Sequence, residues 1–318
     1  MPQYLLRRTA TLVPLLLVVS FIVFSLLYIA PGTPEQLLVG DHVVTPQTLA
    51  AIRQEYGLNH PFIVQYVTWL GHLVRGNLGI SVQNNEPVLQ VIRGPAAVSL
   101  ELAVMATALV ILAGFLIGLL AGTMKDTWVD RIASAGVLVG ASLSTYLSGI
   151  LLIVALAVGV HWFPVFGAGS GVLDRLYHLI LPALALAIAL TASVARVMRA
   201  SVIEIVDQEF IMRARSEGLP THIVFGKHAL RSAAIPAVTM SGLILAGLIG
   251  GSILVEYTFG LGGLGSLLVS SINVKDFAVV QTIALLYTAV FIIGNLVTDV
   301  ICAIVDPRMR LFQGASRD

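Results

Sequence analysis

Six long apolar stretches constrain the fold of this chain more than any other feature. They lie at about 9–30, 98–123, 131–160, 177–199, 237–256 and 279–304. A bilayer core of about 30 Å requires about 20 apolar residues for each helical span. Only 11% of the 318 residues are charged, whereas soluble domains carry about a quarter. The sequence therefore predicts an all-α polytopic membrane protein with six transmembrane helices.

The first apolar stretch has one feature of a signal peptide, because Arg7 and Arg8 precede it. Its apolar run is longer than a normal signal core, and "PGTP" follows it instead of a small-x-small cleavage site. We therefore expect a retained first helix. The net charge of +1 argues against a nucleic-acid-binding protein, which would carry a basic patch. Cys302 is the single cysteine, so the chain cannot form an intrachain disulfide.

The distribution of basic residues predicts the orientation in the membrane. If the N-terminus is cytoplasmic, thirteen of the 18 Lys and Arg residues lie on the inner side, and the short outer loops hold only Arg175 and Lys275. Positive charge accumulates in short cytoplasmic loops, whereas a long outer segment escapes this rule. Both termini are therefore expected in the cytoplasm.

The chain divides into a first helix, an outer segment, a membrane core and a tail. The expected boundaries are 1–30 for the tail and first helix, 31–97 for an external helical segment, 98–305 for the core with a cytoplasmic loop at 200–236, and 306–318 for the C-terminal tail. In the external segment, "TPQTLAAIRQEYGL" predicts a helix capped by Thr45, with Pro46 at its first position. "HPFIVQYVTWLGHLVRG" predicts a second helix with Ile63, Val67 and Leu70 on one face.

Small residues recur every four positions in three of the apolar stretches. They are Gly114, Gly118 and Gly122; Gly136 and Gly140, followed by Ser144 and Ser148; and Gly242, Ala246 and Gly250. Such stripes allow helix backbones to approach closely where lipid supplies no hydrophobic driving force. The stripes indicate helix packing within this subunit or, alternatively, an interface with a second subunit.

The cytoplasmic loop gathers charge around a tight corner. It contains "RARSEGLPTHIVFGKHALRSAAIP", from Arg213 to Pro236. Gly218 suits the position after a helix C-terminus, and Pro220 cannot continue that helix but can begin another. Positive charge alone is an ordinary topology signal. Membrane topology requires the positive charge but not a rigid elbow of helix, corner and helix. Such an elbow suits a docking element that fits the groove of another protein.

This elbow resembles the "EAA" loop of the membrane subunits of bacterial ABC importers, in the version found in oligopeptide and dipeptide permeases. Those loops typically read A-R-A-K-G-L, then R-H-A-L-R-N-A and a proline. This chain has "ARSEGL" from Ala214 to Leu219, then "KHALRSA" from Lys227 and a proline at 236. Glu217 replaces the basic residue of the family, a charge reversal at the expected ATPase contact.

The resemblance extends over nearly the whole chain. "LLRRTATLVPLLLVVSFIVFSLLYIAPGTP" is similar to the family's opening helix, and "NLVTDVICAIVDPRMR" to its closing one. "YGLNHPFIVQYVTWLGHLVRGNLGIS" resembles the outer segment, with Asn77 where Asp is usual. "VEYTFGLGGLG" has Gly262 at a usual proline. "SLSTYLSG" has Thr145 where proline is common, so we expect the third helix to be less kinked.

The resemblance implies the type I ABC importer permease fold and a position as the first of two non-identical permease chains. It implies that the protein is an inner-membrane importer subunit for di- or oligopeptides, with a second permease, one or two ATPase subunits and an external solute-binding protein as partners. Peptides, metal chelates and glutathione-like molecules all remain open as substrates. The positions that would contact the ATPase are Phe210, Arg213, Ala214, Arg215, Glu217, Gly218, Leu219, Pro220, His222 and His228.

Two glycine or lysine motifs imitate nucleotide sites. "GLGGLG" at 260–265 formally satisfies G-x-G-x-x-G, but an apolar stretch of membrane-helix length precedes it where a dinucleotide site needs a strand. "FGKH" lacks the earlier glycine and the final Ser or Thr of a phosphate loop. We therefore expect this chain to be no enzyme and to hold no cofactor, with ATP and Mg²⁺ on the partner ATPases. The scattered histidines show no metal-ligand spacing.

Three acidic residues within or beside the apolar stretches support the main alternative. Glu101, Glu256 and Asp299 are candidates for function, because intramembrane acids often serve as proton relays. An ion-coupled secondary transporter would use Asp299 or Glu256 in this way. It should also show inverted repeats and broken helices near the midplane, and the sequence shows neither. We expect structural roles for all three, and a purely structural scaffold would not need the elbow.

Overall fold

The computed structural model describes residues 2–29, 58–206, 208 and 230–305, and the regular elements in these ranges are helices. The chain forms two compact units. One comprises Met1–Ser99 and Leu261–Ile292, and the other comprises Leu100–Gly260 and Ile293–Asp318. The helices α5 (Val88–Thr123) and α14 (Phe277–Val305) each contribute residues to both units.

Each of the six apolar stretches lies on helix, which confirms the all-helical membrane prediction. Within the described residues, α5 (Val88–Thr123), α8 (Val172–Val206) and α14 (Phe277–Val305) are long and apolar enough to cross a membrane. A pair of helices joined at a bend adds a fourth candidate span. The first stretch lies on α1 (Pro2–Ile29) and the fifth on α11 (Leu230–Gly251).

In the first unit, α1 packs against α4 (Phe62–Val74) through aromatic side chains. Phe24 lies 5.4 Å from Phe62 and 5.3 Å from Trp69, measured between ring centroids. The helix predicted at this position is therefore present, but its packed face is not the predicted one. Ile63 and Val67 are exposed, because the aromatic residues of α4 cover α1 instead. The helix predicted to begin after Thr45 lies outside the described residues.

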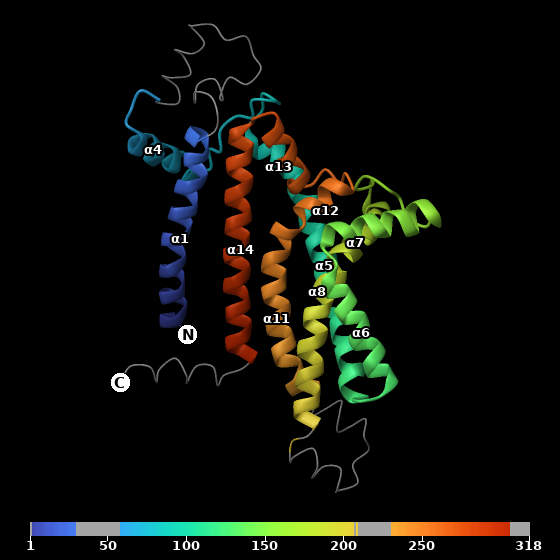
Figure 1. The fold of residues 1–318 in the computed structure, drawn as a ribbon. Coiled ribbons are helices and arrows are strands. Elements are labelled where there is room, and N and C mark those ends of the chain that lie inside the picture. The colour runs from blue at the N-terminus through green and yellow to red at the C-terminus, as the bar shows by residue number, and fades with distance from the viewer. Residues whose placement is uncertain (1, 30–57, 207, 209–229, 306–318) are drawn as a thin grey trace. The chain divides into compact units, whose positions relative to one another are not determined.

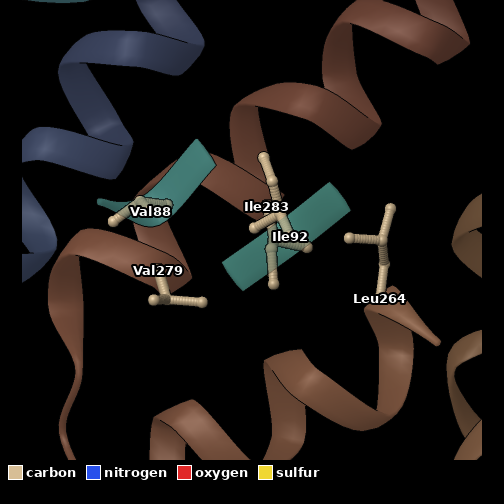
Figure 2. Packing of buried hydrophobic residues seen from close by; sticks show 5 residues of the cluster. All are labelled: Val88, Ile92, Leu264, Val279 and Ile283. Atoms are coloured by element: carbon tan, nitrogen blue, oxygen red, sulfur yellow. The ribbon is translucent and has the colours of Figure 1, made fainter. Parts of the chain in front are cut away.

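The first unit also contains an apolar cluster made by α5, α13 (Leu264–Asn273) and α14. Figure 2 shows the five buried side chains: Val88 and Ile92 of α5, Leu264 of α13, and Val279 and Ile283 of α14. Beside this cluster, the buried carboxylate of Asp276 accepts a hydrogen bond of 2.5 Å from the Ser81 hydroxyl. This bond ties the turn before α5 to the junction between α13 and α14.

In the second unit, the third apolar stretch is broken where we expected a helix with little kink. It forms α6 (Trp128–Ser142), α7 (Thr145–Leu152) and a π-helical turn at Ile153–Gly159, with a bend of 105° between the two halves (Figure 1). The expectation from Thr145 was wrong because no proline is needed for this break. Ser144 has an extended backbone, and its hydroxyl accepts a hydrogen bond of 3.2 Å from the Leu147 amide. It therefore caps a new helix.

The glycine stripe of α5 lies directly against α8. A Cβ atom built on Gly114 would lie 2.7 Å from the Val194 Cβ. One on Gly118 would lie 2.6 Å from the Ala195 carbonyl oxygen, and one on Gly122 would lie 2.7 Å from the Val202 Cβ. Real Cβ atoms do not approach other atoms so closely, so the separation of these two helices depends on glycine at all three positions.

The other small residues differ in their surroundings. A Cβ on Gly140 would meet the Ile188 carbonyl oxygen at 3.3 Å, and one on Gly242 would meet Thr298 at 2.6 Å. By contrast, a Cβ on Gly136 or Gly250 would meet no atom of the described residues within 4 Å, apart from the backbone of its own helix and its chain neighbours. These two glycines are therefore not points of close helix packing within the described part of this subunit. The side chain of Ala246 lies outside the described set.

We predict that Gly118→Ala destabilises the protein by about 1–3 kcal/mol, the usual cost of forcing extra volume into a packed site. The added methyl group would meet backbone, which cannot rotate away. The measurement is thermal unfolding of the purified protein in a mild detergent. Gly136→Ala is the matched control, because its methyl group enters open space on an exposed helix face, where alanine favours the helix. Equal unfolding midpoints for the two variants would contradict the close packing of α5 on α8.

Candidate functional site

The predicted coupling residues lie in the range 209–229, outside the described part of the chain. This applies to Phe210, Arg213, Ala214, Arg215, Glu217, Gly218, Leu219, Pro220, His222 and His228. The structure does describe the helices on both sides of this range. α8 enters it after Val206, and α11 leaves it at Leu230. The candidate site is therefore built from the groups that hold these helix ends.

An ion pair joins the beginning of α6 to the last part of α8. The Arg199 Nε lies 2.6 Å from the Asp130 Oδ1, and the Arg199 Nη2 donates to Oδ2 at 2.7 Å. The Asp130 side chain is buried, whereas the Arg199 side chain is one-third exposed. Two parallel hydrogen bonds from a planar guanidinium fix distance and orientation together, which a single contact would not do.

The same carboxylate organises the turn between α5 and α6. The Asp126 backbone amide donates to the Asp130 Oδ2 at 3.1 Å, and the Ser134 hydroxyl donates to Oδ1 at 3.2 Å. Asp126 adopts a φ of 65°, a left-handed conformation that Asp tolerates better than most residues. Asp130 thus holds the α5–α6 turn, its own helix and α8 in one arrangement. We define Asp130, Arg199, Asp126 and Ser134 as the helix-end clamp.

The sequence alone did not reveal the helix-end clamp. In the sequence, Arg199 is one of the thirteen Lys and Arg residues expected on the inner side of the membrane, and Asp130 belongs to none of the motifs described above. The two residues lie 69 positions apart in the sequence. No rule of residue spacing predicts that the helices carrying them are neighbours. The available signal was an acidic residue in the first turn of one apolar helix and an arginine near the end of another.

The acidic residues considered as proton relays have structural partners where the structure describes them. Glu101 pairs with Arg175 at 3.0 Å, between the Oε1 and Nη1 atoms, and both side chains are partly exposed. Glu256 is fully buried in α12 (Ile253–Thr258), and the Ser252 hydroxyl donates to its Oε1 at 2.8 Å. The side chain of Asp299 lies outside the described set.

The glycine-rich "GLGGLG" stretch joins α12 to α13, so a helix and not a strand precedes it. Gly260 and Gly262 have φ of 56° and 64°. The φ angle of proline is fixed near −65°, so proline cannot take this conformation. The turn at Gly262 therefore differs from a turn that has proline at this position. Within the described residues, no group of three His, Cys, Asp or Glu side chains has the arrangement of a metal site.

Comparison with known proteins relates the chain to transport systems. Residues 114–311 match the family "Binding-protein-dependent transport system inner membrane component", and residues 1–103 match the N-terminal model of binding-protein-dependent transport system membrane components. A glutathione transport system permease protein of Salmonella choleraesuis is 36% identical over 310 residues, covering 98% of this chain and 99% of the relative. A putative peptide transport system permease protein of Brucella abortus is 36% identical over 313 residues, with the same coverage.

A probable peptide ABC transporter permease protein of Sinorhizobium fredii is 34% identical, covering 98% of this chain and all of the relative. Among solved structures, the crystal structure of an amino acid ABC transporter with histidines is similar in fold, with a TM-score of 0.54. That similarity covers 67% of this chain and 92% of the other at 19% identity. It supports the ABC importer permease fold.

We predict that Asp130→Asn lowers the free energy of unfolding by about 2 kcal/mol or more, because it leaves the Arg199 guanidinium without its anion. Thermal or denaturant unfolding in mild detergent measures this change. Asp126→Asn is the matched control, since the Asp126 side chain is exposed and its charge acts on Arg199 as a weaker influence than the Asp130 carboxylate, while its backbone amide makes the hydrogen bond of the clamp.

The double variant Asp130→Asn with Arg199→Gln tests the pairing itself. It removes both charges, so we expect it to be more stable than the sum of the two single changes predicts. Simple additivity of the two single effects would show that the two residues do not act together.

Proposed function

Because this chain belongs to the family of binding-protein-dependent transport system inner membrane components, we propose that it is one of two permease chains in an ATP-driven importer of peptides. The two family models together match almost the whole chain, from residue 1 to residue 311, and this match is the observation that carries the proposal. The function of this family is transport, and the protein is a multi-pass membrane protein of the bacterial inner membrane rather than an enzyme.

The names of the similar proteins support peptides or peptide-like molecules as the substrate class. Relatives at 34–36% identity over 98% of the chain are named as peptide or glutathione permeases. Glutathione is itself a small peptide, so both names describe one chemical class. We propose that a second permease chain completes the path, and that a separate solute-binding protein delivers the substrate.

ATP hydrolysis is assigned to separate ATPase subunits, which would hold ATP and Mg²⁺. The elbow at 209–231 is the proposed coupling element, on the strength of its match to the "EAA" loop. Residues Phe210, Arg213, Gly218 and His222 would lie at the contact with the ATPase. The orientation with both termini in the cytoplasm, supported by the distribution of Lys and Arg, places this elbow on the side where ATP is available.

The helix-end clamp gives this coupling a physical route into the membrane. A displacement of the elbow acts on the end of α8, and Arg199 lies within the last turns of that helix. The bidentate contact with Asp130 passes the displacement to α6 and to the α5–α6 turn. On the other side, α11 begins at Leu230, at the end of the elbow, and packs along α8. We propose that these helices move as one body when the ATPases close.

We predict that Gly218→Val abolishes substrate uptake and substrate-stimulated ATP hydrolysis, while insertion into the membrane is unchanged. The sequence predicts that a helix ends at Gly218, and a β-branched residue would disfavour the left-handed conformation expected of such an end. Uptake into vesicles and ATPase assays on the reconstituted transporter measure this effect. Gly94→Val is the matched control, because Gly94 is exposed on α5 with open space around its Cβ position and lies outside the four-residue stripes of small residues.

Normal uptake by Gly218→Val would contradict the assignment of the coupling elbow.

The energy source of uptake distinguishes an ATP-driven importer from the ion-coupled alternative. Uptake should collapse on depletion of ATP and persist in the presence of an ionophore, whereas the opposite pattern would indicate a secondary transporter.

A further inference from the structure

We propose that a pocket between α5, α6 and α8 binds an anionic phospholipid, with an acyl chain against its apolar wall and the phosphate at Arg196. The proposal adds a lipid site to the permease. It does not depend on which substrate is carried or on how ATP hydrolysis is coupled, and its test measures lipid binding alone.

The pocket is an apolar hollow with a cationic edge. Its volume is about 350 Å³, within the range of small-molecule sites. The floor is formed by small residues of closely packed helices, among them Gly118 and Ala195. The walls carry larger apolar side chains, including Val137 and the exposed Leu138. This surface suits a hydrocarbon chain better than a polar solute.

Arg196 and Arg199 both line this pocket, one helical turn apart on α8, but only one of them is neutralised. Arg199 is held by Asp130 in the helix-end clamp. Arg196 is exposed, and the described residues supply it with no carboxylate partner. An arginine without an internal anion at the rim of an apolar pocket is complementary to a phosphate, which it can bind through two parallel hydrogen bonds.

The surrounding turn strengthens this preference for an anion. Lys125 in the α5–α6 turn and Arg131 in the first turn of α6 are both exposed, and Asp126 is the exposed acid next to Lys125. The local balance is therefore basic. Clusters of basic residues next to membrane helices attract anionic lipid headgroups, and basic pockets between such helices bind them.

The depth of the pocket agrees with a lipid at the membrane boundary. Gly118 lies five residues before the end of α5, and Ala133 lies five residues after the start of α6. At 1.5 Å per residue, Gly118 and Ala133 are about 8 Å from the adjacent ends of α5 and α6. This depth suits the boundary between headgroups and acyl chains if those helix ends lie at the membrane surface. Trp128, 71% exposed at the first position of α6, has the amphipathic character of side chains at this boundary.

Native mass spectrometry of the full chain in mild detergent, with any partner chains that co-purify, tests the proposal. The probes are phosphatidylglycerol and phosphatidylcholine with identical acyl chains, and inorganic phosphate as a competitor. We expect the wild type to bind phosphatidylglycerol about fivefold more tightly than phosphatidylcholine. Arg196→Gln should lose this preference. Arg93→Gln, which removes an exposed arginine that does not line the pocket, should keep it.

A second variant tests the apolar wall separately. Ala133→Phe fills the pocket without changing charge and should weaken binding of both lipids at unchanged helical content. If Arg196→Gln fails to fold, the lipid binding of Ala133→Phe tests the proposal by itself. Equal binding of the two lipids by the wild type, an unchanged preference in Arg196→Gln, or full binding by Ala133→Phe would each overturn the proposal. Efficient competition by inorganic phosphate would also overturn it, because it would indicate a site for a soluble anion instead of a lipid.

Discussion

The close packing of α5 on α8 is the contact on which the rest of the second unit depends. Lipid surrounds membrane helices with hydrocarbon, so burial of apolar side chains cannot drive them together as it does in water. Dense packing has to supply the attraction. Gly114, Gly118 and Gly122 leave a strip of α5 without side chains, and α8 occupies that space. The position of α8 follows, and with it the position of Arg199.

The polar contact of Arg199 with Asp130 complements this packing. Close packing sets the distance between α5 and α8, and a bidentate ion pair adds a directed contact that fixes the orientation of α8 relative to α6. A buried carboxylate is costly without partners, and Asp130 has an arginine, a backbone amide and a hydroxyl around it. The contact is placed where α8 enters the proposed coupling elbow. Under the proposed coupling, a load on the elbow would reach α6 through two directed hydrogen bonds rather than through side-chain packing alone.

Much of the fold was predictable because lipid imposes strict requirements on sequence. A transmembrane helix needs about 20 apolar residues, which appear in the sequence as a long apolar run. Close helix packing needs small residues, which appear at a spacing of four. The helix after His60 was likewise predictable. The face that it buries was not, because Phe62, Tyr66 and Trp69 pack on α1 while Ile63 and Val67 remain exposed. Apolar periodicity does not distinguish a face that contacts protein from one that is open.

The features that escaped prediction depend on contacts between distant residues or on local backbone choices. The break before Thr145 arises from an extended Ser144 whose hydroxyl caps the next helix. The same serine in the middle of a continuous helix would read identically in the sequence. The pairing of Asp130 with Arg199 joins helices that only the folded chain brings together. The assignment of the coupling elbow rests on the sequence alone, since residues 209–229 lie outside the described structure.

The central claim is that this chain works as one subunit of a larger ATP-driven assembly. Gentle purification from its native membrane, with mass spectrometry of every protein that accompanies it, tests this claim most directly. The account predicts a second permease chain of the same family together with a protein that carries a complete phosphate-binding loop. A stable assembly of this chain alone, with no ATPase in any detergent, would contradict the account and direct attention to Asp299 and Glu256 as proton carriers.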